Sequence, residues 1–123
     1  MKDNGVMRTS STGANRNTDK GKIRYVGAIS PLVTRAYGEY IESHSLLPDG
    51  TRRSNGNWQN LFGTPKEHQD TCTESLYRHM IDYLLEHDGY KSQDGIEAAL
   101  GGMMFNLQSI WFSMLKEKED TNE

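Results

Sequence analysis

The sequence predicts a small all-α protein: a bundle of about three main helices with a flexible N-terminal arm and a long loop between the first two helices. Apolar residues recur at helical spacing in three separate segments. Each segment begins near a serine, threonine or aspartate that can cap a helix. The one short extended segment, residues 20–29, carries Gly21 and Gly27, which argue against a long strand.

The size and composition of the chain fit a single domain with a small core. The chain has 123 residues, of which 34% are hydrophobic. A lone domain of this size with polar ends is marginally stable, so we expect a homo-oligomer. Residues 1–19 are polar and lack periodicity, which predicts a flexible arm. Residues 20–115 then form the helical domain, and residues 116–123 form a charged tail.

The first helix is predicted to start at Ser30 and Pro31, because serine is a good N-cap and proline suits the first helical position. It should run to about His44 or Ser45. Residues 46–70 follow as a connection rich in glycine, asparagine, proline and charge, and a loop of that length is often functional. The apolar stripe of the helix consists of Leu32, Val33, Ala36, Tyr37, Tyr40 and Ile41.

The second and third helices follow this loop. Thr71 and Glu74 fit a capping box, so the second helix is predicted to open near Thr71 and to stop at Gly89. The third helix is predicted to begin at Asp94, and its periodicity is the strongest in the chain. Its helical spacing is carried by Ile96, Leu100, Met103, Met104, Leu107, Trp111, Met114 and Leu115.

Charge and cysteine usage exclude several functional classes. The net charge is -3, whereas domains that grip a nucleic acid backbone are usually basic, so duplex nucleic acid is not an expected partner. The single cysteine, Cys72, allows no internal disulfide, which fits a reducing compartment. No stretch approaches the ~20 apolar residues of a membrane span. We therefore expect a cytoplasmic protein without a membrane partner.

Two pairs of side chains could bind a metal ion or take part in catalysis. Glu39 and Glu42 form an E-x-x-E step in the first helix, and His79 and Asp82 form an H-x-x-D step in the second. Residues three apart share a helix face, so each pair can aim two groups at one point. All four could surround Mg²⁺, with His79 and Asp82 as catalytic residues. The alternative is that the glutamates are solvated and that His79 and Asp82 bond each other or cap a loop.

Basic and aromatic side chains supply candidate contacts to a nucleotide. Arg78 offers a planar donor fork that matches a phosphate. A basic strip made of Lys20, Lys22 and Arg24 could clamp phosphates, with Tyr25 stacking on a base. The strip could equally be a solvated arm.

Three further candidates lie in the loop and in the third helix. Trp58 could anchor the loop or stack on a purine, and Asn57 could read a base edge or satisfy loop backbone. Asn106 falls among apolar residues and needs partners, from the loop or from a ligand. Gly101 and Gly102 weaken the helix, so we expect another helix or a ligand to approach closely there.

The order of several short motifs resembles a known family. The motifs are G-A-N-R-N-T-D-K-G-K (13–22), S-P-L (30–32), N-W-Q (57–59), S-L-Y-R-H-M-I-D (75–82) and E-A-A-L…F-N (97–106). Their order resembles that of small phage and prophage proteins described as dATP/dGTP diphosphohydrolase N-terminal-domain proteins. Those proteins are similar to the all-α, MazG-like nucleotide pyrophosphohydrolases. The resemblance covers roughly residues 13–115.

The resemblance implies a helical, oligomeric, Mg²⁺-dependent enzyme that splits a purine (d)NTP into monophosphate and pyrophosphate. The metal motif of that superfamily is E-x-x-E followed by E-x-x-D. Glu39 and Glu42 match the first half, but His79 stands where the second half has a glutamate. Imidazole is a poorer Mg²⁺ ligand than carboxylate. Residues 98–102 also lack the histidines that many relatives carry.

Two functions from different classes follow. The first is the Mg²⁺-dependent pyrophosphohydrolase, with Arg78, Lys22 and Arg24 neutralising phosphate charge. The second is a catalytically silent phage protein that binds and sequesters a host nucleotide immune signal of the cyclic or ADP-ribose type, without metal. A third, more distant alternative is an interaction protein with no ligand.

Overall fold

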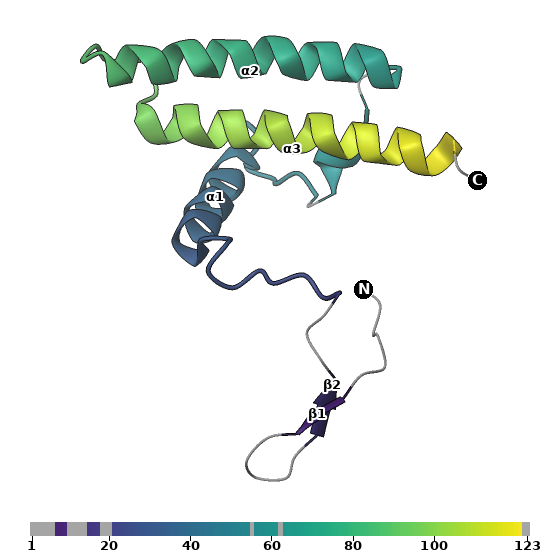
Figure 1. Ribbon diagram of the computed structural model, residues 1–123. Coiled ribbons are helices and arrows are strands. Elements are labelled where there is room, and N and C mark those ends of the chain that lie inside the picture. The colour runs from purple at the N-terminus through teal and green to yellow at the C-terminus, as the bar shows by residue number, and fades with distance from the viewer. Residues whose placement is uncertain (1–6, 10–14, 18–20, 55, 62, 122–123) are drawn as a thin grey trace. The chain divides into compact units, whose positions relative to one another are not determined.

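The computed structural model describes residues 7–9, 15–17, 21–54, 56–61 and 63–121. This part of the chain holds three α-helices, α1 (Pro31–His44), α2 (Pro65–His87) and α3 (Ile96–Thr121), and a short 3-10 helix, η1 (Asn57–Gln59) (Figure 1). The predicted all-α class is therefore confirmed. The chain divides into two units, residues 1–34 and 35–123, and each is described by itself.

The first unit contains the two strands of the described chain. β1 (Met7–Thr9) pairs antiparallel with β2 (Asn15–Asn17), with Met7 opposite Asn17. Both strands lie inside residues 1–19, the segment for which a flexible arm is predicted, and the flexibility stays a prediction. Further along, the backbone turns between Val26 and Ile29, which form an isolated bridge, so residues 21–30 form no long strand.

The bounds of α1 agree with the prediction from its caps. The Val33 amide donates to Ser30 Oγ at 3.2 Å, which satisfies one of the free donors at the start of the helix. The helix ends at His44, whose Nδ1 lies 2.9 Å from the Tyr40 carbonyl oxygen. The ring of His44 also packs against that of Tyr40 in a tilted arrangement, with centroids 4.1 Å apart.

The predicted start of α2 near Thr71 is wrong, because the helix begins six residues earlier at Pro65. Thr64 is the N-cap, and its Oγ1 accepts from the Glu67 amide at 3.2 Å. Proline at the first helical position and Glu67 two residues later complete the start of the helix. The Thr71 hydroxyl instead donates to the Glu67 carbonyl at 2.9 Å, one turn inside the helix.

A tight connection joins α2 to α3 and makes them an antiparallel hairpin (Figure 1). α2 stops at His87 as predicted from Gly89, which adopts φ 92°, and the Tyr90 amide closes the end by donating to the Leu85 carbonyl at 2.9 Å. The Glu86 carboxylate then accepts from the Ser92 amide at 2.9 Å and from its hydroxyl at 3.0 Å. These bonds, and the nearby charge of Lys91, lower the pKa of Glu86 below its usual value.

The interface between α2 and α3 is made of small and polar residues rather than large apolar ones. We call it the seam, and its members follow alternating spacings of four and three residues. On α2, His68, Cys72, Ser75 and His79 contact α3, and Asp82 and Glu86 continue the same face of the helix; on α3 the members are Ala99, Gly102, Asn106, Ser109 and Ser113. Among the described residues, only Cys72 and Ala99 are buried hydrophobic ones. The core is therefore even smaller than the composition suggests.

Two other elements of the second unit contact α3 through side chains. The Tyr37 hydroxyl on α1 donates to Gln108 Oε1 at 3.4 Å. Trp58 of η1 meets Phe112 edge-on, with ring centroids 4.9 Å apart. α3 itself continues to Thr121, so most of the predicted charged tail is helical. No helix in the described part of the chain is both long and apolar enough to cross a membrane.

Candidate functional site

The strongest candidate site is the stretch Arg78–Asp82 in the middle of α2. His79 and Asp82 are seam residues one turn apart, and both are half-buried. The imidazole of His79 lies directly over Gly102 of α3, so closely that a Cβ on Gly102 would be 2.5 Å from ring atoms. Arg78 precedes His79 and is exposed. The sequence prediction that these three residues act together is compatible with this arrangement.

His79 and Asp82 differ from the other polar members of the seam in their hydrogen bonding. His68 Nε2 lies 2.8 Å from Ser109 Oγ, and Asn106 Nδ2 donates to Ser75 Oγ at 3.2 Å. Ser113 accepts from Gln69, and Glu86 from Ser92. In the part of the chain that the structure describes, His79 and Asp82 make neither a hydrogen bond nor an ion pair. Half-buried polar groups of this kind can receive a ligand or water.

The two consecutive glycines of α3 explain how three helices approach one another. A Cβ on Gly101 would lie 2.5 Å from the Tyr40 ring of α1, just as one on Gly102 would meet His79. The close approach expected at these glycines is therefore made by side chains of two other helices. Asn106 is buried next to them and also donates to the Gly102 carbonyl at 2.7 Å, so its amide is satisfied within the protein.

Tyr40 was assigned only to an apolar stripe by sequence reasoning, but its surroundings are polar as well. Burial raises the pKa of its phenol, and the negative charge of Asp94 at the start of the hairpin's second arm raises it further. Tyr37 stacks nearby, with ring centroids 6.5 Å apart. Nothing in the sequence linked Asp94 to this tyrosine, because 54 residues separate them.

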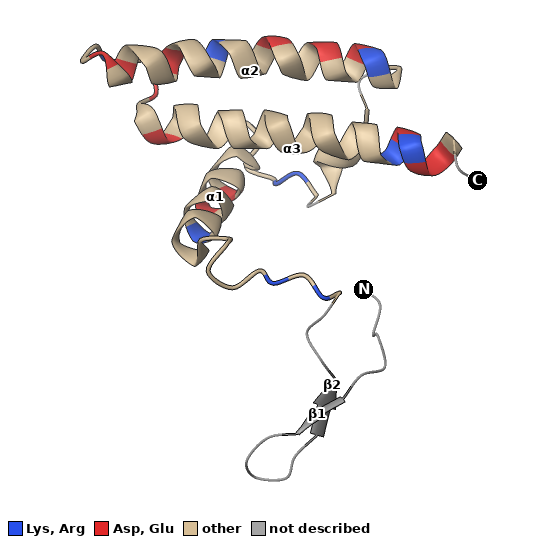
Figure 2. Cartoon of the chain, viewed as in Figure 1, with Lys and Arg blue, Asp and Glu red and all other residues tan. Residues whose placement is uncertain are grey.

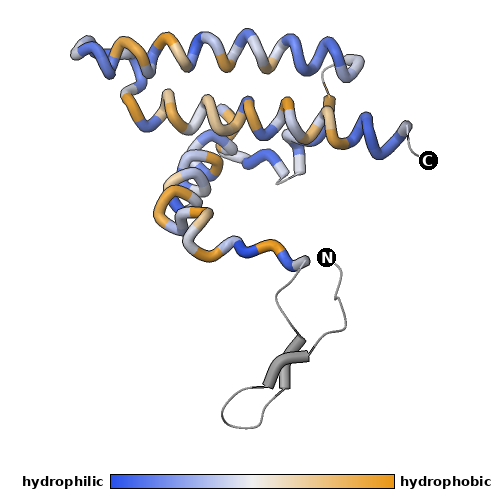
Figure 3. Tube along the Cα trace, in the orientation of Figure 1, coloured by the Kyte–Doolittle hydropathy of each residue, from blue (hydrophilic) through white to orange (hydrophobic). Residues whose placement is uncertain are grey.

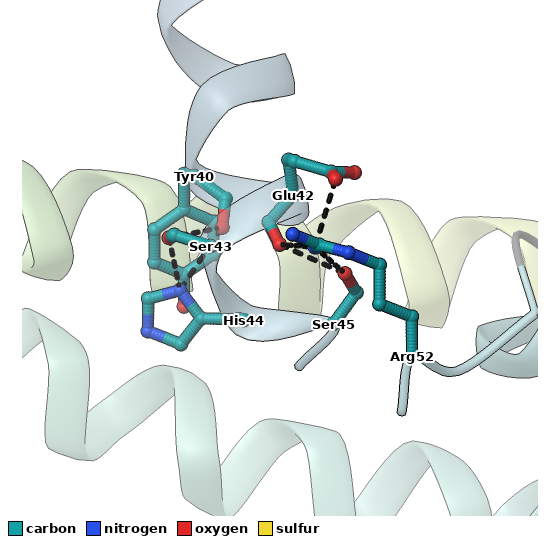
Figure 4. A network of polar contacts seen from close by, with 6 residues as sticks. All are labelled: Tyr40, Glu42, Ser43, His44, Ser45 and Arg52. Carbon is teal, nitrogen blue, oxygen red and sulfur yellow. Dashed lines mark hydrogen bonds and ion pairs between the residues drawn. The ribbon is translucent and has the colours of Figure 1, made fainter. Parts of the chain in front are cut away.

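The two glutamates predicted to bind Mg²⁺ lie on α1, and Figure 4 shows the polar contacts of one of them, Glu42. Glu42 pairs with Arg52 at 2.8 Å, and the same guanidinium donates to the Glu42 carbonyl at 3.0 Å and to Ser45 Oγ at 3.1 Å. Glu39 is exposed. Within the described ranges, no three residues among histidine, cysteine, aspartate and glutamate are grouped so that they could hold a metal ion.

The four predicted ligands Glu39, Glu42, His79 and Asp82 therefore do not fit a Mg²⁺ site within one chain as it is arranged here. One carboxylate is already neutralised by an arginine, and the imidazole is packed against a glycine backbone. Mg²⁺ as a cofactor stays a prediction that rests on the spacing of these residues in the sequence.

The remaining predicted ligand contacts fall into two groups. Arg24 and Tyr25 are exposed and Lys22 is half-buried, all in the first unit, and Lys20 lies outside the described residues. In the loop, Trp58 contacts Phe112, which matches the anchoring interpretation of this tryptophan. Asn57 is exposed, and its carbonyl accepts from the Asn60 amide at 3.1 Å. Whether Asn57 and Trp58 also contact a ligand stays a prediction.

A second polar cluster was missed by the sequence analysis. Cys72 Sγ lies 3.6 Å from both His68 Nε2 and Ser109 Oγ, and all three residues are buried in the seam. The signal that could have revealed it is the four-residue step from His68 to Cys72, which only becomes visible once α2 is extended back to Pro65. Its burial makes this cluster structural rather than a reactive thiol site.

Comparison of the chain with protein-family models, with curated proteins and with solved structures returns no match.

Proposed function

We propose that this protein binds a small purine nucleotide at Arg78, His79 and Asp82. The observation that supports the proposal most directly is the contrast within the seam. Its other polar side chains are hydrogen-bonded, whereas His79 and Asp82 have no partner among the residues that the structure describes. Arg78, beside them, is exposed and likewise forms no ion pair in that part of the chain.

The three side chains have complementary roles in such a complex. Arg78 can give a bidentate contact to a phosphate, and its charge suits the phosphate's negative charge. His79 can donate a ring N–H to a phosphate oxygen or accept from a hydroxyl. Asp82 accepts only, so it would take a ribose hydroxyl or an exocyclic amine of the base. The net charge of -3 does not favour a nucleic acid polymer as the ligand.

Sequestration of an intact nucleotide is the form of this function that the arrangement favours. It requires no metal, and the pairing of Glu42 with Arg52 leaves that carboxylate engaged. Hydrolysis of a (d)NTP to monophosphate and pyrophosphate with Mg²⁺ is the second candidate. It is supported by the E-x-x-E spacing of Glu39 and Glu42 and by the family-like order of the motifs.

Calorimetry combined with mass spectrometry distinguishes the two. The purified protein is titrated with dATP, dGTP, ATP, a cyclic dinucleotide and ADP-ribose, once with EDTA and once with Mg²⁺. Sequestration predicts binding in EDTA and release of the unchanged nucleotide after heat denaturation. Hydrolysis predicts monophosphate and pyrophosphate in the Mg²⁺ samples only. Absence of binding for every ligand in both buffers would refute the proposal.

Matched arginine variants test the site itself. Arg78→Ala should weaken binding at least tenfold, because a charge-assisted contact contributes about 1.5–3 kcal/mol. Arg53→Ala serves as the control, since Arg53 is also exposed but lies in the loop after α1. Equal affinity of the two variants would place the ligand away from Arg78. His79→Gln and Asp82→Asn then report the neighbouring contacts without removing side-chain bulk.

A further inference from the structure

One side of α3 carries a row of large apolar side chains that none of the described residues of the second unit covers. We call it the outer face, and the exposed fractions of its members range from 37% for Met104 to 69% for Trp111. Their spacing of three, four and one residues keeps them on one side of the helix. The outer face consists of Ile96, Leu100, Met104, Leu107, Trp111, Met114 and Leu115.

The outer face is distinct from the surfaces that α3 uses within the chain. The seam toward α2 runs through Gly102, Asn106 and Ser109, while α1 and η1 contact Gly101, Gln108 and Phe112. At about 100° per residue, these two surfaces occupy the remaining sides of the helix. The C-terminal half of α2 adds exposed apolar residues to the hairpin, namely Tyr77, Met80, Ile81, Leu84 and Leu85.

The area of the outer face is too large for an ordinary monomer surface. Seven side chains of roughly 200 Å² each, about half exposed, present on the order of 700 Å² of apolar surface. Monomers rarely expose more than about 300–600 Å² in one apolar patch. The described residues have only Cys72 and Ala99 as buried hydrophobic residues, so the apolar surface that should form a core lies outside instead.

We propose that a second copy of this chain covers the outer face, so that α3 of one chain packs against α3 of the other. Residues 98–115 contain no charged residue, as Figure 2 shows for most of α3, and Figure 3 shows hydrophobic residues recurring along this part of the helix. A partner surface must therefore be equally apolar and free of charge, and the same face of another copy meets that requirement. About 700 Å² per chain is close to the ~800 Å² that each partner contributes to a standard interface.

The symmetry of such a pair follows from its being self-complementary. The same patch on both subunits produces a closed two-fold dimer, the commonest arrangement of soluble oligomers. The spacing of the apolar residues along α3 allows their side chains to pack between the α3 helices of two copies. The outer face must be covered whenever the hairpin folds. A second copy of the chain is always present when the chain is produced, so it can always serve as the partner.

Sedimentation of the full chain at several concentrations tests the proposal. The dimer predicts a mass twice the 14.0 kDa of one chain at micromolar concentration. In a Trp58→Phe background, emission from Trp111 should shift to the red on dilution, as the indole returns to the 69% exposure seen in one chain. A monomer at 100 µM with full helical circular dichroism would overturn the proposal, and would indicate that another protein or residues 1–34 cover the face.

Substitutions on and off the outer face localise the interface. Leu107→Glu should give monomer or unfolded chain, whereas Glu74→Gln on the exposed side of α2 should leave the dimer intact. Because Leu107→Glu could fail to fold, a second test uses the cysteine-free variant Cys72→Ser as background. Leu100→Cys, Met104→Cys, Leu107→Cys or Trp111→Cys is added to it one at a time, and each protein is oxidised. Covalent dimers at one or more of these sites, and none for Glu74→Cys, are expected. Cross-linking at Glu74→Cys alone would overturn the assignment.

Discussion

Adding one methyl group to Gly102 should destabilise this protein, although alanine is normally the better helix residue. Gly102 lies inside α3, and in an isolated helix Gly→Ala stabilises by roughly 0.5–1 kcal/mol. Here the new Cβ would lie 2.5 Å from the His79 ring, well inside van der Waals contact. The ring or the helix must therefore move, and overpacking of this kind typically costs about 1–3 kcal/mol.

A matched control is available in α1. Gly38 is also inside a helix, but a Cβ there would meet nothing within 4 Å. Gly38→Ala should thus show the helix-propensity gain alone, about 0.5–1 kcal/mol. Gly102→Ala should show a net loss of about 1–2 kcal/mol, since the clash outweighs the same gain. The two variants should therefore differ by about 2 kcal/mol in the free energy of unfolding.

Urea unfolding followed by helical circular dichroism measures this difference. With a slope of about 1–3 kcal/mol per molar urea for a small protein, the two midpoints should lie about 1 M apart, on either side of the wild-type midpoint. All samples need the same chain concentration, because a dimer's stability depends on it. If Gly102→Ala is as stable as Gly38→Ala, with an unchanged slope, then the ring of His79 does not pack on α3 as described.

Three further predictions follow from the contacts of α1, the hairpin turn and the seam. Burial and the charge of Asp94 raise the pKa of Tyr40 above 10.0, so the folded state holds the phenol proton more tightly than the unfolded state does. The free energy of unfolding should therefore be unchanged below about pH 10 and fall as the pH rises through the folded pKa. Urea midpoints of wild type and Tyr40→Phe at alkaline pH test this. Hydrogen bonds from Ser92 lower the pKa of Glu86 below 4.5, so the ionised carboxylate should stabilise the folded state above that pH. This stabilisation should disappear as the pH falls through the folded pKa. Glu86→Gln should therefore make the free energy of unfolding depend less on pH in the acidic range. Asn106→Ala should lower the free energy of unfolding by about 1–3 kcal/mol, because it leaves Ser75 in the seam without its donor, whereas Asn57→Ala on the exposed loop should change it by less than about 0.5 kcal/mol.

Sequence reasoning located the helices well where a cap was unambiguous. Ser30 with Pro31 predicted the start of α1, and Gly89 predicted the end of α2. The start of α2 was misplaced because Thr64, Pro65 and Glu67 provide a second cap seven residues before the one at Thr71. Both sites carry threonine followed three residues later by glutamate, and the polar residues between them obscured the helical spacing of His68 and Cys72.

The candidate site was only partly predictable, because spacing along a helix does not reveal what lies opposite. The H-x-x-D step correctly put His79 and Asp82 on one face of α2, but the sequence does not show that Gly102 lies under the imidazole. Likewise, the E-x-x-E step could not reveal that Arg52, ten residues beyond Glu42, folds back onto that carboxylate. Contacts between residues this far apart depend on loop conformation, which local periodicity does not determine.

The polar seam and the apolar outer face have one physical explanation in common. A helix pair that uses glycine, alanine and serine at its own interface brings the two backbones close together, and large side chains must then lie elsewhere. Apolar burial has to come from a partner, which the proposed dimer supplies, while polar groups such as His79 and Asp82 remain at the seam. The outer face and the site at Arg78–Asp82 use different residues. Nucleotide binding can therefore be measured on a folded variant in which a substitution at Leu107 prevents dimerisation. Loss of dimerisation without loss of binding would separate the two proposals, and each can therefore fail independently.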